Sequence, residues 1–195
     1  MRIKYMLFFL LLLFSTSACG TGFDADPCDL ESIIIPTLPA VIPDEFELDE
    51  TTNLHKSGDP QVIDLESYLL KITGLVDHPM SFTYDQLRCM PRITDIPTLN
   101  CPRTFIDKAQ WSGVRLAYIL KQTGIREGAS TLYIISADGY SAKVNLEDAL
   151  LPVNYLAYEW EGEPLPIMHG FPLRAVFPNL NGSHWVKWLV EIRVE

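Results

Sequence analysis

The chain ends in the ten residues Val186-Lys187-Trp188-Leu189-Val190-Glu191-Ile192-Arg193-Val194-Glu195. Apolar side chains occupy every second position from Val186 to Val194, and charged residues fill most of the positions between them. Successive side chains of a strand point to opposite faces, so this period of two predicts a strand with one apolar face. We therefore expect the C-terminal segment to be one strand of a sheet that covers a core.

Further strands and short helices are indicated upstream. The patterns predict strands over 67–75, 131–137 and 141–144, and helices over 83–87, 114–122 and 146–150. Asp138-Gly139 is a hairpin turn signal between two of these strands. Thr83 and Asn145 carry side chains that cap helix N-termini, and Gly124 follows a helix end. Many short strands with a few brief helices predict an α+β domain built on a β-rich mixed sheet, over residues 61–195.

The composition is that of an acidic globular protein. The chain has 195 residues, of which 48% are hydrophobic and 21% charged, with a formal net charge of -10. This length is enough for one domain with its own core. The negative charge argues against nucleic acid as a partner, because a phosphate backbone favours a basic surface. Four cysteines are too few for a fold held together mainly by disulfides.

The N-terminus has the features of an export signal over residues 1–18. Arg2 and Lys4 precede a nine-residue apolar run, 6–14, and small residues lead to Cys19. That run is much shorter than the roughly 20 residues needed to span a bilayer. A Cys directly after Ser-Ala is typical of a bacterial lipoprotein cleavage site, so we expect Cys19 to carry a lipid. The expected location is the cell envelope, with a membrane anchor; an ordinary signal peptide cut nearby is the alternative.

A tether is expected between the anchor and the domain, over residues 19–60. It contains Pro36, Pro39 and Pro43 and the acidic run 44–50. Prolines and self-repelling charge favour an extended spacer. The alternative is that the apolar pairs within 33–35 and 41–42 pack onto the domain as an N-terminal arm.

Acidic residues are absent from two segments that carry cations. Residues 164–188 hold no Asp or Glu but contain His169, Arg174, His184 and Lys187. In so acidic a chain these segments suggest a pocket for an anion, because Arg and Lys are the side chains that bind phosphate groups. Asn181-Gly182-Ser183 could add backbone and hydroxyl donors. A core region with incidental charges would give the same composition.

Cys101 and Arg103 lie in the second acid-free segment, 96–106. A thiolate near Arg would have a lowered pKa and would be a good ligand for a soft metal. In an oxidising compartment, however, a Cys89–Cys101 disulfide is a competing possibility. No two Cys or His residues have zinc-ligand spacing, and no phosphate-binding loop is present.

An ordered set of motifs resembles the sulfite oxidase family of molybdopterin oxidoreductases. The resemblance covers roughly residues 60–195. It rests on Cys101, Trp111-Ser-Gly113, Ala137-Asp138-Gly139-Tyr140-Ser141, His169-Gly170-Phe-Pro172-Leu-Arg174 and Val186-Lys187-Trp188. It implies that the Cys101 sulfur binds molybdenum and that a molybdenum-molybdopterin cofactor is held by His169, Arg174 and Lys187. By the same resemblance Ser183 and His184 also contact the cofactor, whereas Arg103 and Asp138 face the substrate.

The implied reaction is oxygen-atom transfer to or from a small substrate such as sulfite or a sulfoxide. The sequence lacks a haem-attachment Cys-x-x-Cys-His, so electrons would pass to a separate haem- or quinone-linked protein. The chain ends directly after the last strand, so a monomer without the dimerisation domain of larger sulfite oxidases is expected. That cofactor is normally inserted in the cytoplasm, whereas this signal resembles those for unfolded chains. Either the interpretation of the signal is wrong, or the cofactor enters after export, or the chain is a non-catalytic anion- or partner-binding lipoprotein on the same fold.

Overall fold

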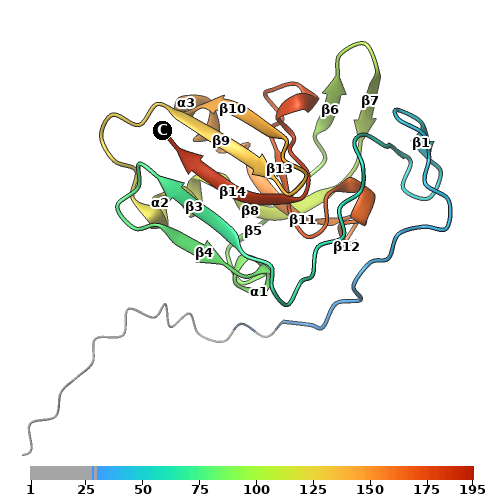
Figure 1. Cartoon of the computed structure of the whole chain (residues 1–195), viewed down its shortest axis with the longest axis horizontal. Coiled ribbons are helices and arrows are strands. Elements are labelled where there is room, and N and C mark those ends of the chain that lie inside the picture. Colours follow the sequence, from blue (N-terminus) through green and yellow to red (C-terminus); the bar gives the residue numbers. More distant parts are fainter. Residues whose placement is uncertain (1–27, 29) are drawn as a thin grey trace, which may run out of the picture.

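A computed structural model describes Cys28 and residues 30–195 (Figure 1). The predicted signal, 1–18, and the lipidation site Cys19 lie outside the described residues. In the described part no helix is both long enough and apolar enough to cross a membrane.

Two five-stranded sheets form the body of the domain (Figure 1). The first has the order β10-β9-β14-β3-β4, with bounds β10 Ser141–Asn145, β9 Thr131–Ser136, β14 Leu189–Val194, β3 Leu70–Gly74 and β4 Met80–Phe82. The second has the order β12-β11-β8-β5, and β13 also pairs with β11; the bounds are β12 Glu163–Pro164, β11 Tyr155–Trp160, β8 Trp111–Arg115, β5 Arg92–Asp95 and β13 Arg174–Val176. The sequence predicted an α+β domain with β-rich, mixed strand pairing, and this fold class is confirmed.

Short helices and two hairpins complete the fold. The helices are α1 Tyr84–Arg88, α2 Leu116–Thr123 and α3 Leu146–Ala149, with 3-10 turns η1 Ile167–His169 and η2 Gly182–His184. The hairpins are β1 Leu48–Asp49 with β2 Leu54–His55, and β6 Thr98–Cys101 with β7 Phe105–Lys108. Both hairpins and η2 lie beside the cavity described below, so the irregular parts of the chain build the site.

Local sequence signals explain several elements. Thr83 caps α1 in a capping box with Gln86, as its side chain predicted. Strands β9 and β10 pair antiparallel across the predicted Asp138-Gly139 turn. Strand β3 pairs parallel with β14, and at Gly74 (φ 86°) a Cβ would lie 2.1 Å from the Val194 carbonyl oxygen. Only glycine permits that approach.

Two predicted elements differ from the structure. The helix expected over 114–122 begins only at Leu116, because the preceding residues form β8 between two other strands. The terminal strand begins at Leu189, since Trp188 has a left-handed backbone (φ 50°). A register shift then follows between Leu189 and Glu191, so Leu189 is buried and Val190 only half-buried. The alternation of buried and less buried side chains predicted from the sequence is therefore broken at Leu189 and Val190 and resumes after them.

Candidate functional site

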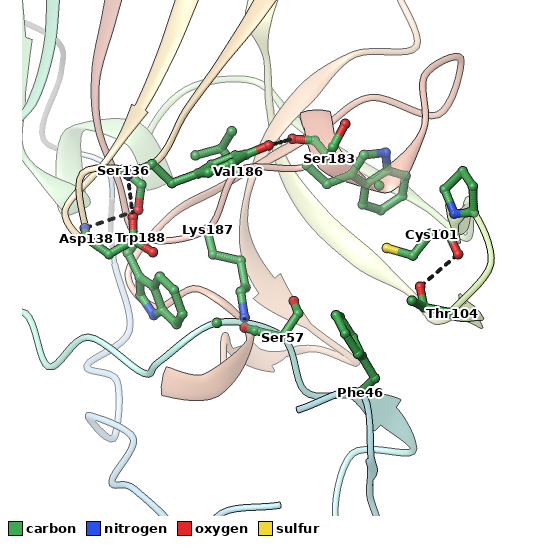
Figure 2. Close-up of a pocket in the computed structure, with 15 residues that line it drawn as sticks. Phe46, Ser57, Cys101, Thr104, Ser136, Asp138, Ser183, Val186, Lys187 and Trp188 are labelled. Atoms are coloured by element: carbon green, nitrogen blue, oxygen red, sulfur yellow. Dashed lines mark hydrogen bonds between the residues drawn. The ribbon is translucent and has the colours of Figure 1, made fainter. Parts of the chain in front are cut away.

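Two adjoining cavities meet beside Cys101 (Figure 2). The larger has a volume of about 350 Å³, and the smaller, about 30 Å³, lies next to it. Both cavities are lined by Ser57, Cys101, Gly182, Trp185 and Lys187. The larger one opens between the β6–β7 hairpin, the η2 loop, the β9–β10 turn and the segment 46–58. Strands and loops far apart in the sequence thus converge on a single sulfur atom.

Cys101 ends strand β6 and has a free, half-buried thiol. Its carbonyl oxygen accepts hydrogen bonds from the backbone N–H of Thr104 (3.1 Å) and from the Thr104 hydroxyl (2.9 Å), which closes the hairpin turn. Burial raises the pKa of the Cys101 thiol, and the positive charge of Arg174 acts in the opposite direction. The expected lowering of this pKa by Arg103 is therefore wrong. Arg103 is exposed, has a left-handed backbone (φ 69°) and lines neither cavity.

The alternative disulfide between Cys89 and Cys101 is also excluded. Cys89 is bonded to Cys28, 61 residues earlier in the chain. This leaves the Cys101 sulfur available as a ligand.

The η2 loop lies directly against the Cys101 sulfur. A Cβ added at Gly182 would lie 2.2 Å from Cys101 Sγ and 3.2 Å from the Asn100 carbonyl oxygen. The loop is held there by the Tyr140 hydroxyl, which donates to the Ser183 carbonyl oxygen (2.9 Å). Ser183 and Asp138 line the larger cavity, as their predicted roles require. His184 lies within 3.2 Å of the Asn181 side chain in its own loop and lines neither cavity.

Arg174 is a buried cation beside the thiol. Its guanidinium lies 4.6 Å from the ring centroid of Trp111 and 5.7 Å from that of Trp185. One nitrogen, Nη1, donates to the His169 carbonyl oxygen (3.1 Å), while Nε is buried without a partner in the described structure. Burial lowers the pKa of Arg174 to about 10. A donor without an acceptor at this depth is costly, so the side chain is suited to an added anionic or polar ligand.

Lys187 is the second cation at the site. Its Nζ donates to the carbonyl oxygens of Ser57 and of Met168, the latter at 2.8 Å, and lies 4.3 Å from the ring centroid of Trp188. Burial, with the nearby charge of Arg174, lowers the pKa of Lys187 to about 7. Among the described residues no carboxylate forms an ion pair with Arg174 or Lys187. The predicted anion-binding character thus agrees with the geometry of both side chains.

His169 lines the smaller cavity as a neutral ring. Its Nε2 lies 2.8 Å from the Thr52 hydroxyl and 3.3 Å from Asp49 Oδ2, and the Thr52 hydroxyl donates to Asp49 (2.7 Å). Because that hydroxyl proton is already used and the carboxylate only accepts, Nε2 must carry a proton, and Nδ1 is left as an acceptor. Burial lowers the pKa of His169 to about 3, so the imidazole is uncharged at neutral pH.

The segment 44–58 is the part of the site that the sequence did not indicate. We call it the strap. It holds hairpin β1–β2, and its Phe46, Ser57 and Gly58 line the larger cavity, which Figure 2 shows from inside. It is fastened at His169, as above, and at Asp107, which accepts from the His55 backbone N–H (2.8 Å) and lies 2.6 Å from His55 Nδ1.

The strap falls within the predicted tether, 19–60. Its acidic residues suggested a solvated spacer, but Asp49 is buried against His169. The apolar residues proposed as an alternative arm behave differently: Ile33 packs on the core, whereas Ile34 and Val41 are exposed. No spacing in the sequence connects Thr52 with His169, 117 residues away, so only the fold reveals these contacts.

The residues present fit an anionic cofactor that brings its own metal ligands. In the part of the chain that the structure describes, no group of three or more His, Cys, Asp or Glu side chains could hold a metal ion. One free thiol, two cations without carboxylate partners and an unpartnered guanidinium N–H are what the site offers instead. A soft metal already held by sulfur, on an organic anion, matches this set.

Comparisons with known proteins agree with that chemistry. The family model described as "Oxidoreductase molybdopterin binding domain" matches residues 56–195. The chain is 35% identical over 138 residues to the uncharacterized oxidoreductase YuiH of Bacillus subtilis, covering 70% of this chain and 69% of that protein. It is 33% identical over 171 residues to sulfite oxidase of Arabidopsis thaliana, covering 69% of this chain but 44% of that protein.

A solved structure supports the fold. The chain superposes on the sulfane dehydrogenase SoxCD of Paracoccus pantotrophus with a TM-score of 0.68 and 22% sequence identity. The match covers 91% of this chain and 56% of that one. The chain therefore spans only about half the length of the plant enzyme and of this structure.

Proposed function

Because the chain belongs to the oxidoreductase molybdopterin-binding domain family, we propose that it is a molybdenum-cofactor-dependent oxidoreductase that acts outside the cytoplasm. The observation that carries the proposal is the position of the free Cys101 thiol beside Arg174, Lys187 and neutral His169. The substrate is a small sulfur compound, either sulfite or a sulfoxide. When bound, the cofactor supplies the two-electron, oxygen-atom-transfer chemistry.

Each site residue has a distinct task in this proposal. Cys101 is the protein's metal ligand, and Gly182 leaves room for the ligand sulfur. Arg174 and Lys187 bind the anionic groups of the cofactor, where burial makes charge-assisted hydrogen bonds strong. His169 Nδ1 accepts a hydrogen bond, since Asp49 and Thr52 fix its tautomer. Asp138 and Tyr140 line the outer part of the cavity, where substrate enters.

Two further parts of the proposal concern location and electrons. Attachment through a lipid on Cys19 would place the enzyme in the cell envelope, and the Cys28–Cys89 disulfide supports export, because disulfides persist in oxidising compartments. Transfer of one oxygen atom moves two electrons and two protons, with water as the oxygen source or product. In this proposal a separate haem- or quinone-linked protein exchanges the electrons.

The test is metal analysis of protein purified from its native envelope. We expect close to one molybdenum per chain, and we expect Cys101→Ser to lose it. The matched control is the double substitution Cys28→Ser with Cys89→Ser, which removes sulfur elsewhere and should retain the metal. Native protein without molybdenum that still binds phosphate through Arg174 and Lys187 would instead make it a non-catalytic anion-binding lipoprotein.

A further inference from the structure

An apolar stretch without charge precedes the strap. Residues 32–43 contain no Asp, Glu, Lys or Arg. Ile34 is 87% exposed and Val41 80%, and Ile35, Leu38 and Ile42 are also exposed. Single exposed apolar residues are ordinary, but five within nine positions of an acidic chain indicate a surface that contacts something.

This stretch is fastened to the domain just before it begins. Cys28 is bonded to Cys89, the residue that caps the C-terminus of α1. Arg88 Nη2 donates to the Glu31 carbonyl oxygen (2.9 Å), and Ile33 packs on the core. Because Leu87 of α1 is fully buried, the attachment point is part of the rigid domain. The exposed side chains are therefore displayed in a fixed place.

The predicted anchor lies close to that place in the sequence. Cys28 follows Cys19 by only nine positions. A chain of that length spans at most about 30 Å when fully extended. If Cys19 carries the lipid, Cys28 and the Cys89 end of α1 lie within that distance of the bilayer, and residue 32 follows Cys28 by only four positions. Without the disulfide, no covalent bond would join this segment to α1, and the spacer after Cys19 would continue as far as the strap.

We propose that residues 32–43 rest on the membrane surface, with Ile34, Ile35, Leu38, Val41 and Ile42 in contact with lipid. This inference rests on the exported, lipid-anchored part of the proposed function. Pro36, Pro39 and Pro43 lack backbone donors, which disfavours pairing of this segment with a strand of another protein. An extended segment with unpaired carbonyls belongs among hydrated headgroups rather than in the hydrocarbon.

The charge of the residues that follow this stretch indicates which kind of lipid surface it would contact. The uncharged stretch is followed directly by the acidic run 44–50. Anionic lipids would repel this run, so a zwitterionic surface is favoured. In Figure 1 the stretch starts at the lower edge beside α1 and rises along the right-hand side to hairpin β1–β2.

The experiment uses the full lipidated chain in phosphatidylcholine vesicles that contain a photoactivatable diazirine phosphatidylcholine. After illumination, mass spectrometry maps the lipid-modified peptides. We expect modification within residues 30–43 and none at Ile106, a 67% exposed apolar residue of β7 that serves as the internal control. The double substitution Ile34→Ser with Val41→Ser should lower modification of that peptide about tenfold, whereas Ile106→Ser should leave it unchanged.

Several outcomes would overturn this inference. They are equal modification of Ile106 and residues 30–43, no modification of residues 30–43 in vesicle-bound chain, or a chain that has no lipid on Cys19 and does not bind vesicles. The intact mass of the N-terminal peptide reports the lipid directly. Molybdenum content is measured independently, so loss of this inference does not affect the cofactor assignment.

Discussion

The side chains at Cys101 divide into a ligand and the groups that shape the space around it. Gly182 is the clearest example of a residue that shapes this space, because any side chain there would collide with the Cys101 thiol. The other members act through charge: Arg174 and Lys187 are held by carbonyl oxygens and aromatic faces rather than by carboxylates among the residues described. The site is thus complementary to a ligand that brings negative charge and metal together.

We expect Gly182→Ala to lower molybdenum content several-fold while changing stability little. Its Cβ would lie 2.2 Å from Cys101 Sγ, so the η2 loop must move away from the proposed metal ligand. Metal analysis checks the first effect and urea unfolding the second. Asn179→Ala, at an exposed position just before this loop, is the control and should retain the metal. Equal metal content in the two variants would contradict the assignment.

A second prediction concerns the charge on Lys187. Burial lowers its pKa from 10.5 to about 7, so between these values the unfolded chain binds more protons than the folded one. Wild-type stability should therefore rise with pH from 7 to about 10 through this residue. Lys187→Met removes that slope and should stabilise the unloaded protein by about 1–3 kcal/mol at pH 6. It should also weaken cofactor retention.

Urea unfolding of unloaded wild type and Lys187→Met at several pH values provides the measurement. The difference between them should shrink as pH rises. A difference that stays constant from pH 6 to 10 would show that Lys187 is not held at a depressed pKa. Lys143→Met, an exposed substitution on β10, is the matched control and should show no such trend.

At the level of elements, the strap is a wall of the cavity that is held by packing of Leu54 in the core, by stacking of His55 on Phe105 and by polar contacts. Thr52 connects Asp49 with His169, and Asp107 holds His55. These polar contacts run from the N-terminal segment to η1 and β7 and involve neither five-stranded sheet. We therefore expect their loss to affect the strap more than the sheets.

Thr52→Val should loosen the strap selectively. It removes the hydroxyl between Asp49 and His169, and we expect a local cost of about 1–2 kcal/mol. Hydrogen–deuterium exchange should become faster in peptides from 44–58 and stay unchanged in β9. Thr51→Val, at an exposed neighbour that bonds Asp49 through its backbone, is the control. Faster exchange throughout the domain would argue for a general loss of stability instead.

Some elements of this fold could be predicted from the sequence, and others could not. Caps and turns were predictable because Thr83 and Asp138-Gly139 act on residues next to them. The strap was not, since its acidic residues resemble a solvated spacer until Asp49 meets a partner 120 residues away. The Cys101 site was indicated by missing acids and by a resemblance, whereas the environment that raises its pKa was visible only in the fold.

At the scale of the whole molecule, the Cys28–Cys89 disulfide joins the N-terminal segment to the body of the domain. It closes a loop of 61 residues that contains the strap and β3. Such a cross-link restricts the unfolded chain. The sequence suggested only Cys101 as a partner for Cys89, because these two residues are twelve positions apart, whereas Cys28 meets Cys89 only in the fold.

Replacing both residues, Cys28→Ser with Cys89→Ser, should lower the free energy of unfolding by about 2–4 kcal/mol. Urea unfolding under non-reducing conditions measures this, and reduced wild type should match the variant. Cys101→Ser should cause a smaller change, since its thiol is unpaired. A double variant as stable as wild type would mean that this bond does not form in solution.

The unneutralised cations of the interior have a consequence for how long each molecule survives in the cell. Burial of Arg174 and Lys187 opposes folding until an anion joins them, so a chain that has received its cofactor unfolds less often than one that has not. Proteases act on molecules that unfold, and small differences in stability change abundance several-fold. Under the proposed function, the amount of this protein should therefore follow the supply of molybdenum, even at a constant rate of synthesis.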